Sequence, residues 1–153
     1  MTTRPRIVLD TNVLVSGVLF EGGNEAKILQ LAANGDIEVF ISPDILAEFL
    51  DVLSRPKFRL TQEEVSTTFS FLLAVAKLAI PLRPVRAQLR DPDDLKLLSC
   101  ATEAKATHVV TGDKDLLTIR KSNRTTILTP SKFIRHLKTI DLIGSSKRNF
   151  DLA

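Results

Sequence analysis

The sequence predicts an α/β fold in which a parallel sheet is covered by helices on both faces. Short apolar segments rich in β-branched residues alternate with longer segments that have helical spacing. This alternation is typical of βαβ units, whose crossover helices cover both faces of a parallel sheet. The length of 153 residues suits one domain with a sizeable core. We expect residues 1–143 to form that domain and residues 144–153 to be a flexible tail.

Four segments have the composition of strands. Their ranges are 6–10, 37–42, 107–113 and 125–128. We interpret a fifth segment, 79–82, as either a short strand or a connector. The alternation of these segments with helices predicts that the strands run parallel.

Six segments have helical spacing and recognisable ends. Their ranges are 25–35, 42–56, 61–79, 91–106, 114–119 and 130–140. Thr61 and Glu64 form a T-x-x-E capping box before an apolar face. Ser42 and Asp91 are the expected caps of the helices that they begin, and a proline follows each of them.

The composition limits the class of protein. Hydrophobic residues make up 44% of the chain and the net charge is +3, which permits an anionic partner without requiring one. Trp and Tyr are absent, so a nucleic-acid surface built on exposed aromatic stacking is not expected. The single cysteine, Cys100, fits a reducing compartment. Because no apolar stretch approaches ~20 residues and no signal-peptide pattern is present, we expect a cytoplasmic protein without a membrane partner.

Two aspartates come directly at the ends of predicted strands. Asp10 ends the first strand, and Asp113 ends the strand at 107–113. The carboxyl ends of parallel strands meet at one edge of a sheet, where ligands gather in α/β folds. We therefore expect the two carboxylates to lie at the same edge. The alternative for each is an ordinary turn aspartate.

Two further acids are expected on helices, at or beside the apolar face that packs on the sheet. Glu48 sits at the border of the apolar arc of its helix, from which it can reach around the end of the sheet. Asp94 stands on the same side of its helix as Leu97 and Leu98, so it is expected to point inward. Stabilisation by the helix macrodipole explains an acid in a first turn, but it does not require that direction.

Four acids that converge need a cation, because clustered and buried carboxylates repel one another. A ligand set of oxygens without His or Cys suits a hard ion such as Mg²⁺ or Mn²⁺. The two histidines, His108 and His136, are expected to be structural or surface residues, and the sequence has no zinc-ligand spacing.

Four motifs in order resemble the PIN domain family, in particular the bacterial PIN toxins of toxin–antitoxin pairs. They read VLDTNVLVSG, PDILAEFLDVL, DPDDLKLLSCATEAKATHVVTGDKDLL and ILTPSKFI, and the similarity covers about residues 5–140. The resemblance implies a three-layer α/β/α sandwich with a parallel sheet of about five strands. It also implies an endoribonuclease that depends on Mg²⁺ or Mn²⁺ and leaves a 3′-hydroxyl and a 5′-phosphate.

The resemblance carries the family's acidic positions onto four residues of this chain. As catalytic and metal-binding residues it gives Asp10, Glu48, Asp94 and Asp113, the same four that the strand and helix patterns select. As supporting residues it gives Asn12, Thr111 and Asp115, the last ranked below Asp113. Asp91 and Asp93 are expected to be helix-start residues, and of these two Asp93 is the better candidate for a supporting contact with a second metal ion.

Substrate phosphates would need cations near these acids. Arg90, before Asp91, and Lys114, after Asp113, are the preferred candidates for substrate binding. Further candidates are Arg83, Arg86, Arg120 and Lys121. The alternative for each is ordinary solvated surface charge.

The expected partners are an RNA substrate and an antitoxin protein, and a homodimer is compatible with the family. Three alternatives stay open. A phosphatase with an aspartate nucleophile would need D-x-D, whereas Asp10 is followed by Thr11 and Asn12. A PIN-like fold could instead be a non-catalytic module that binds RNA or an antitoxin. It could also be a nuclease of RNA processing that has no antitoxin.

Overall fold

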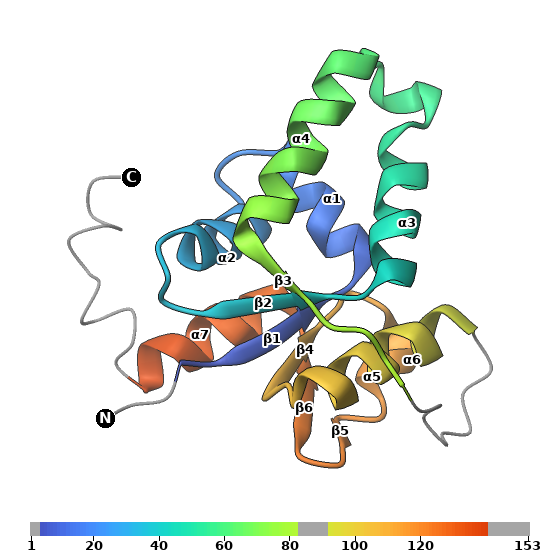
Figure 1. Cartoon of the computed structure of the whole chain (residues 1–153). Coiled ribbons are helices and arrows are strands. Elements are labelled where there is room, and N and C mark those ends of the chain that lie inside the picture. Colours follow the sequence, from blue (N-terminus) through green and yellow to red (C-terminus); the bar gives the residue numbers. More distant parts are fainter. Residues whose placement is uncertain (1–3, 83–91, 141–153) are drawn as a thin grey trace.

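A six-stranded sheet forms the centre of the molecule (Figure 1). The structure is a computed structural model that describes residues 4–82 and 92–140. The strands are β1 (Arg6–Leu9), β2 (Glu38–Ile41), β3 (Ala76–Leu78), β4 (His108–Val110), β5 (Lys121–Ser122) and β6 (Thr125–Leu128). Their order across the sheet is β3-β2-β1-β4-β6-β5.

The register of the sheet places the carboxyl ends of the central strands at one edge. Leu9 of β1 is level with Val110 of β4, which is level with Leu128 of β6. Strands β1, β2, β3, β4 and β6 run parallel to one another, and β5 pairs antiparallel with β6. The predicted parallel sheet of about five strands is therefore confirmed, with β5 as an addition that the sequence did not predict.

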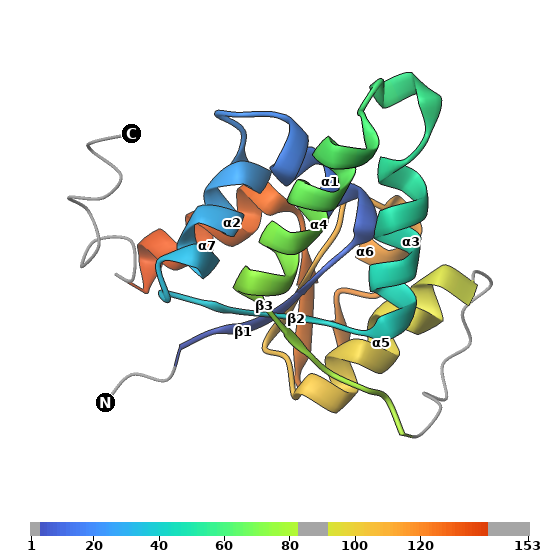
Figure 2. The same ribbon diagram turned by 45° about the horizontal axis from the view of Figure 1, so that its top comes forward.

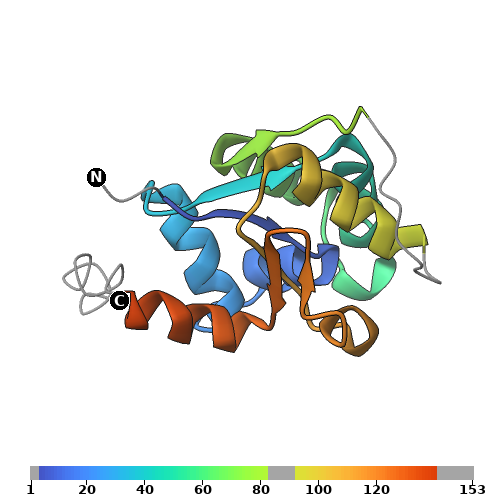
Figure 3. The same cartoon turned by 90° about the horizontal axis from the view of Figure 1, so that it is seen from below.

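Helices cover both faces of this sheet. On one face lie α1 (Thr11–Leu19), α2 (Asn24–Ala33), α3 (Pro43–Leu53) and α4 (Gln62–Val75) (Figure 1). On the opposite face lies α5 (Pro92–Ala104), which is seen in front of the strands in Figure 3. The last helix, α7 (Pro130–Thr139), lies beside α2 (Figure 2). The three-layer architecture that the sequence predicts is confirmed.

Two short elements complete the chain. The 3₁₀ turn η1 (Pro56–Phe58) leads from α3 towards α4, and α6 (Lys114–Leu117) follows β4 and contacts β6. Within the described residues, no helix combines the length and the apolar character that crossing a bilayer requires.

Side chains from all three layers form one core. Ile7, Val8 and Leu9 of β1 are at most 1% exposed, because this central strand is covered on both faces. Phe49 on α3 and Leu98 on α5 are buried from opposite sides of the sheet. Burial of large apolar side chains contributes about 1.5–3 kcal/mol each, so this core holds the strand ends in fixed positions.

The segment predicted as one helix over 61–79 divides into a helix and a strand. Its start is as predicted, because Thr61 and Glu64 form both hydrogen bonds of the capping box, at 2.9 and 3.0 Å. The helix ends at Val75, and Ala76 begins β3, which pairs with Val39 of β2. The open edge of β2 binds this segment, so a tertiary interaction overrides its helical spacing. The predicted strand or connector at 79–82 therefore follows β3 as a connector.

Helix α1 was not predicted, because its nine residues form a largely apolar run with little helical contrast between faces. The remaining elements agree with the predictions within a few residues at their ends. The predicted cap Asp91, the cations Arg83, Arg86 and Arg90, and the tail 144–153 lie outside the described residues.

Candidate metal-dependent active site

The first acid of the site lies at the junction of β1 and α1. The backbone N–H of Asp10 donates to the carbonyl of Val110 at 2.9 Å, which extends the pairing with β4 by one residue. The chain then turns into α1, and the Asp10 carboxylate caps that helix by accepting from the N–H of Asn12 at 3.3 Å. The carboxylate at the end of the first strand is therefore fixed by the strand on one side and by the helix on the other.

Thr111 connects this acid to the acid that follows β4. Its hydroxyl donates to Oδ2 of Asp10 at 2.7 Å and accepts from the N–H of Asp113 at 3.0 Å. Its own N–H donates to the carbonyl of Leu128 at 3.0 Å, and the residue is fully buried. The supporting position predicted for Thr111 thus lies between Asp10 and Asp113.

Glu48 reaches the same edge from α3. Ser42 caps this helix through the N–H of Ile45, as predicted, and Glu48 follows one turn later and is half-buried. Burial raises the pKa of the Glu48 carboxyl above its usual 4.5, and the negative charges of Asp93 and Asp10 act in the same direction. A hydrogen bond with the Thr11 side chain opposes that rise in pKa. Glu48 therefore occupies a crowded, negatively charged environment.

Helix α5 contributes two acids from the opposite face of the sheet. The inward direction predicted for Asp94 is confirmed, because the residue is only 8% exposed beside Leu97 and Leu98. Asp93 is exposed and pairs with Lys96 one turn later at 3.4 Å. These two neighbours therefore differ in burial although they share the first turn of the helix.

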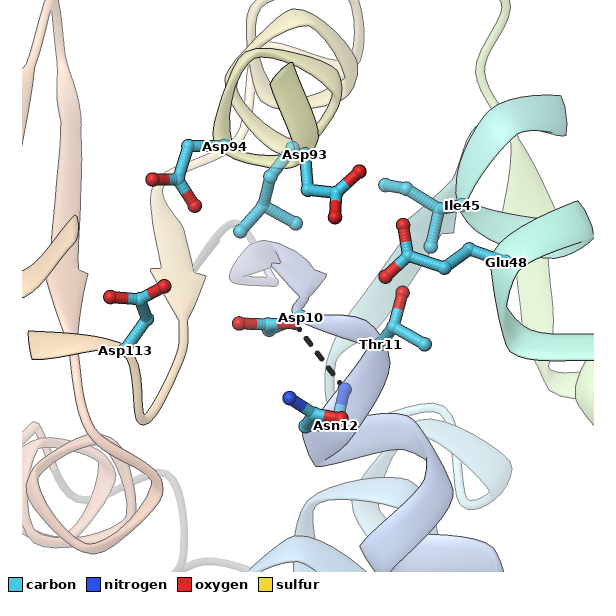
Figure 4. Close-up of a pocket in the computed structure, with 9 residues that line it drawn as sticks. Asp10, Thr11, Asn12, Ile45, Glu48, Asp93, Asp94 and Asp113 are labelled. Atoms are coloured by element: carbon cyan, nitrogen blue, oxygen red, sulfur yellow. Dashed lines mark hydrogen bonds between the residues drawn. The ribbon is translucent and has the colours of Figure 1, made fainter. Parts of the chain in front are cut away.

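These acids line one pocket (Figure 4). Asp10, Glu48, Asp93, Asp94 and Asp113 surround it, and Asp94 and Asp113 lie on the side opposite Glu48. The cavity of about 140 Å³ has room for a small hydrated ion, since water occupies about 30 Å³ per molecule in the liquid. The structure thus brings together the four acids selected from the sequence, which are up to 103 positions apart, with Asp93 as a fifth.

The described residues of the pocket do not form a closed ligand cage. Among the residues that the structure describes, no group of three or more His, Cys, Asp or Glu side chains has the arrangement that would hold a metal ion. The acids lie around a cavity instead of meeting at a point (Figure 4). The chemistry of the donors nevertheless fits a hard cation, because the described ionisable side chains that line the pocket are carboxylates.

The other predicted site residues divide into those in the pocket and those outside it. Asn12 lines the pocket. Asp115 is exposed, and its backbone N–H donates to Oδ1 of Asp113 at 2.9 Å, so it positions that acid through its backbone. Lys114 is exposed at the start of α6 and does not line the pocket. Arg90 lies outside the described residues.

Sequence reasoning missed the lining contributed by Thr11, Ile45 and Leu97. Thr11 is 4% exposed, and its side chain forms a hydrogen bond with Glu48. Its position next to Asp10 was the one available signal. Ile45 and Leu97 follow the same helical spacing as Glu48 and Asp94, so their place in the pocket wall was recoverable from the helix period.

The comparisons with known proteins agree with this fold. The family model of the PIN domain matches residues 6–115, and the chain therefore belongs to the PIN domain family. PIN domains are generally nucleases. An uncharacterized protein of Methanocaldococcus jannaschii, MJ1680, is 33% identical over 121 residues, which cover 78% of this chain and 77% of that protein.

A solved structure has the same fold. It is the crystal structure of VapBC2 from Rickettsia felis bound to a DNA fragment from their promoter. The TM-score is 0.56 at 18% identity, over 80% of this chain and 96% of that one. At that identity the match establishes the fold.

Proposed function

We propose that this PIN domain is a Mg²⁺- or Mn²⁺-dependent endoribonuclease and the toxin of a toxin–antitoxin pair. The observation that carries the proposal is the convergence of Asp10, Glu48, Asp94 and Asp113 around one pocket at the carboxyl edge of the sheet. A cluster of carboxylates around one pocket is costly, because like charges repel and burial disfavours ionisation. The cost is offset when the cluster binds a divalent cation.

The same four acids are the proposed catalytic and metal-binding residues. Asp94 is the most buried of them, and Asp10 is held by hydrogen bonds from Thr111 and from the Asn12 backbone. When bound, a divalent ion makes hydroxide available from water near neutral pH and neutralises charge on a phosphate. The carboxylates orient that ion, and Ile45 and Leu97 form an apolar part of the pocket wall.

The proposed role of the supporting residues Thr111 and Asp115 is to hold the catalytic acids in position. Thr111 fixes Asp10 relative to Asp113, and the backbone of Asp115 fixes Asp113 in turn. Asp93 faces the pocket from α5 and is the proposed contact for a second ion. Arg90 and Lys114 are the proposed contacts for substrate phosphates. Groups that orient metal ligands in this way typically change metal affinity or activity by about 10–100-fold when they are lost.

The biological assignment rests on the family resemblance and on the fold shared with VapBC2. We propose an antitoxin protein as the partner, a cytoplasmic location, and a homodimer as the form in solution. A non-catalytic module would have no need to keep all four acids around one pocket, so we favour the nuclease.

The experiment compares the wild-type protein with Asp10→Asn on single-stranded RNA, with Mg²⁺, with Mn²⁺ and with EDTA. We expect metal-dependent cleavage by the wild type and, in Asp10→Asn, a loss larger than the about 10–100-fold that follows removal of a group that only orients a metal ligand. Asp44→Asn is a matched control, because Asp44 is exposed on α3 and does not line the pocket. Equal cleavage by wild type and Asp10→Asn would contradict the proposal.

A further inference from the structure

The chain that follows Asp113 leads to the β5 edge of the sheet and carries several exposed basic side chains. Asp113 caps α6, which begins with Lys114, and the chain then enters the β5–β6 hairpin with Arg120, Lys121 and Arg124. All four cations are exposed. In the described part of the chain, no carboxylate lies within ion-pair distance of any of them. We call Arg120, Lys121 and Arg124 the basic edge.

The register of the hairpin sets the direction of the basic edge. The carbonyl of Arg120 accepts from the N–H of Ile127 at 2.8 Å, and Lys121 pairs with Thr126. Arg124 comes directly before β6, at the end of that strand far from the pocket. Since a strand rises about 3.3 Å per residue, the basic edge runs on the order of 10 Å down the sheet from the pocket side.

The hairpin that carries these cations is well anchored. Thr125 is 6% exposed, and its hydroxyl donates to the carbonyl of Ala106 at 2.7 Å. Leu116 of α6 is fully buried and Ile127 of β6 is 5% exposed. The backbone beneath the three cations is therefore held by the core, so their spacing is fixed by the fold.

At the opposite edge of the sheet, the basic side chains form ion pairs within the protein. On β3, Lys77 lies 3.3 Å from Glu38, and the same carboxylate also pairs with Arg4 and Arg6. That glutamate links strands β1, β2 and β3, so the cations there have a structural partner. The basic edge has no such partner among the described residues, and its charge is available to an external anion.

We propose that the basic edge binds the phosphate backbone of the single-stranded RNA whose scissile bond lies in the acidic pocket. The inference rests on the proposed function, because it places the substrate strand along β5 as the strand leaves the pocket. An acidic pocket repels a polyanion, and cations that contact the bound strand outside the pocket offset that repulsion. Cations that contact phosphates supply affinity that is independent of sequence and sensitive to salt.

The test measures binding of a fluorescent single-stranded RNA by anisotropy in EDTA, so that binding is separated from metal-dependent turnover. The test variant replaces Arg120, Lys121 and Arg124 with Gln. The matched control replaces Lys27, Lys57 and Arg59 with Gln, which removes the same charge from exposed positions on α2 and in the α3–α4 connection. A third variant, Arg120→Lys with Lys121→Arg and Arg124→Lys, keeps the charge.

We expect the test variant to bind RNA at least about 10-fold more weakly and to show a salt slope less negative by about 2, since single strands contribute roughly 0.7 per phosphate contact. The control and the charge-conserving variant should bind like the wild type. Equal weakening by test and control variants would overturn the proposal, because net charge alone would then explain it. Absence of RNA binding by the wild type would overturn it as well.

A charged edge strand also protects a sheet from pairing with other chains. If the test variant binds RNA normally but aggregates in size-exclusion chromatography, the cations serve that protective role and the proposal is wrong. RNA binding through the basic edge without any metal-dependent cleavage would leave the proposal standing and contradict the nuclease assignment. If the test variant cleaves RNA and binds it as the wild type does, the nuclease assignment stands and the proposal for the basic edge is wrong.

Discussion

The hydroxyl of Thr111 donates to Oδ2 of Asp10 across 2.7 Å, joining residues that are 101 positions apart in the chain. The Thr111 hydroxyl oxygen in turn accepts from the N–H of Asp113 at 3.0 Å. One buried hydroxyl therefore sets the relative position of two acids that end neighbouring parallel strands. Removing it should affect both the fold and the chemistry of the pocket.

Thr111→Val replaces this hydroxyl by a methyl group of similar size. We expect destabilisation by about 1–3 kcal/mol, because hydrogen-bonding groups in a buried site lose their partner. We also expect cleavage to fall by about 10–100-fold, because Asp10 loses its orienting hydrogen bond. Urea denaturation and initial cleavage rates measure the two effects. Thr111→Ser keeps the hydroxyl and should retain most activity; a Val variant as active as the wild type would refute the positioning role.

Glu48→Gln should stabilise the metal-free protein. Burial raises the pKa of Glu48, so its charge costs stability once the pH exceeds the folded-state pKa, and that cost is absent below the unfolded value of 4.5. The melting temperature in EDTA should therefore rise more at pH 8 than at pH 4. Mg²⁺ should raise the melting temperature of the wild type and have a smaller effect on the variant, because binding to the native state stabilises it.

The control for this measurement is Glu63→Gln, because Glu63 is exposed on α4 and does not line the pocket. It should leave both the EDTA and the Mg²⁺ melting temperatures unchanged. A lower melting temperature of Glu48→Gln in EDTA at pH 8 would show that the Glu48 charge is compensated without a metal ion.

His108 should make the protein less stable as the pH falls. Burial lowers the pKa of His108 to about 4, and the neighbouring His136, 4.9 Å away between ring centroids, acts in the same direction. Below pH 6.5 the unfolded chain gains a proton on this residue that the folded state does not take up until about pH 4. Stability that is present above pH 6.5 is therefore lost progressively between those two values.

Urea unfolding at pH 7.5 and pH 5 measures this effect against His108→Gln, which cannot titrate. The wild type should lose about 1–2 kcal/mol more than the variant over that range, after a discount for the part of the ring that faces solvent. The comparison cancels the contribution of the carboxylates, which titrate in both proteins. Equal losses would mean that His108 titrates normally in the folded state.

Cys100 should be inert to thiol reagents in the native protein. The residue is fully buried on α5, and burial raises the pKa of its thiol to about 12. The thiolate is the reactive form, and it is scarce at pH 8 under these conditions. A colorimetric disulfide reagent should therefore react only after urea unfolding. Rapid reaction of the native protein would show that α5 opens locally at this position.

Local signals in the sequence determined most elements and the identity of the four acids. These signals act within one or two helical turns. They are the capping box at Thr61, the cap at Ser42 and the residue spacing that places Asp94 on the buried side of its helix. The structure agrees with each of them. Such features depend on neighbouring residues alone, so periodicity and residue type suffice to predict them.

Pairing between distant segments decided the rest. Residues 76–78 have helical spacing but form β3, because the open edge of β2 offers hydrogen bonds to them. Strand β5 forms because Lys121 and Ser122 pair with Thr126 and Thr125 of β6. Helix α1 forms although its sequence shows little difference in hydrophobicity between its faces.

The sequence by itself determined which residues could supply the chemistry and on which strand ends and helix faces they stand. Only the tertiary structure decided that Thr111 bridges Asp10 and Asp113 and that Thr11 forms a hydrogen bond with Glu48. It also decided that the acids line one pocket, in which the described side chains form no closed cage. The physical reason is that these relationships depend on the register of the sheet and on helix packing across its two faces. Those are set by the burial of side chains far apart in the chain, which no local pattern encodes.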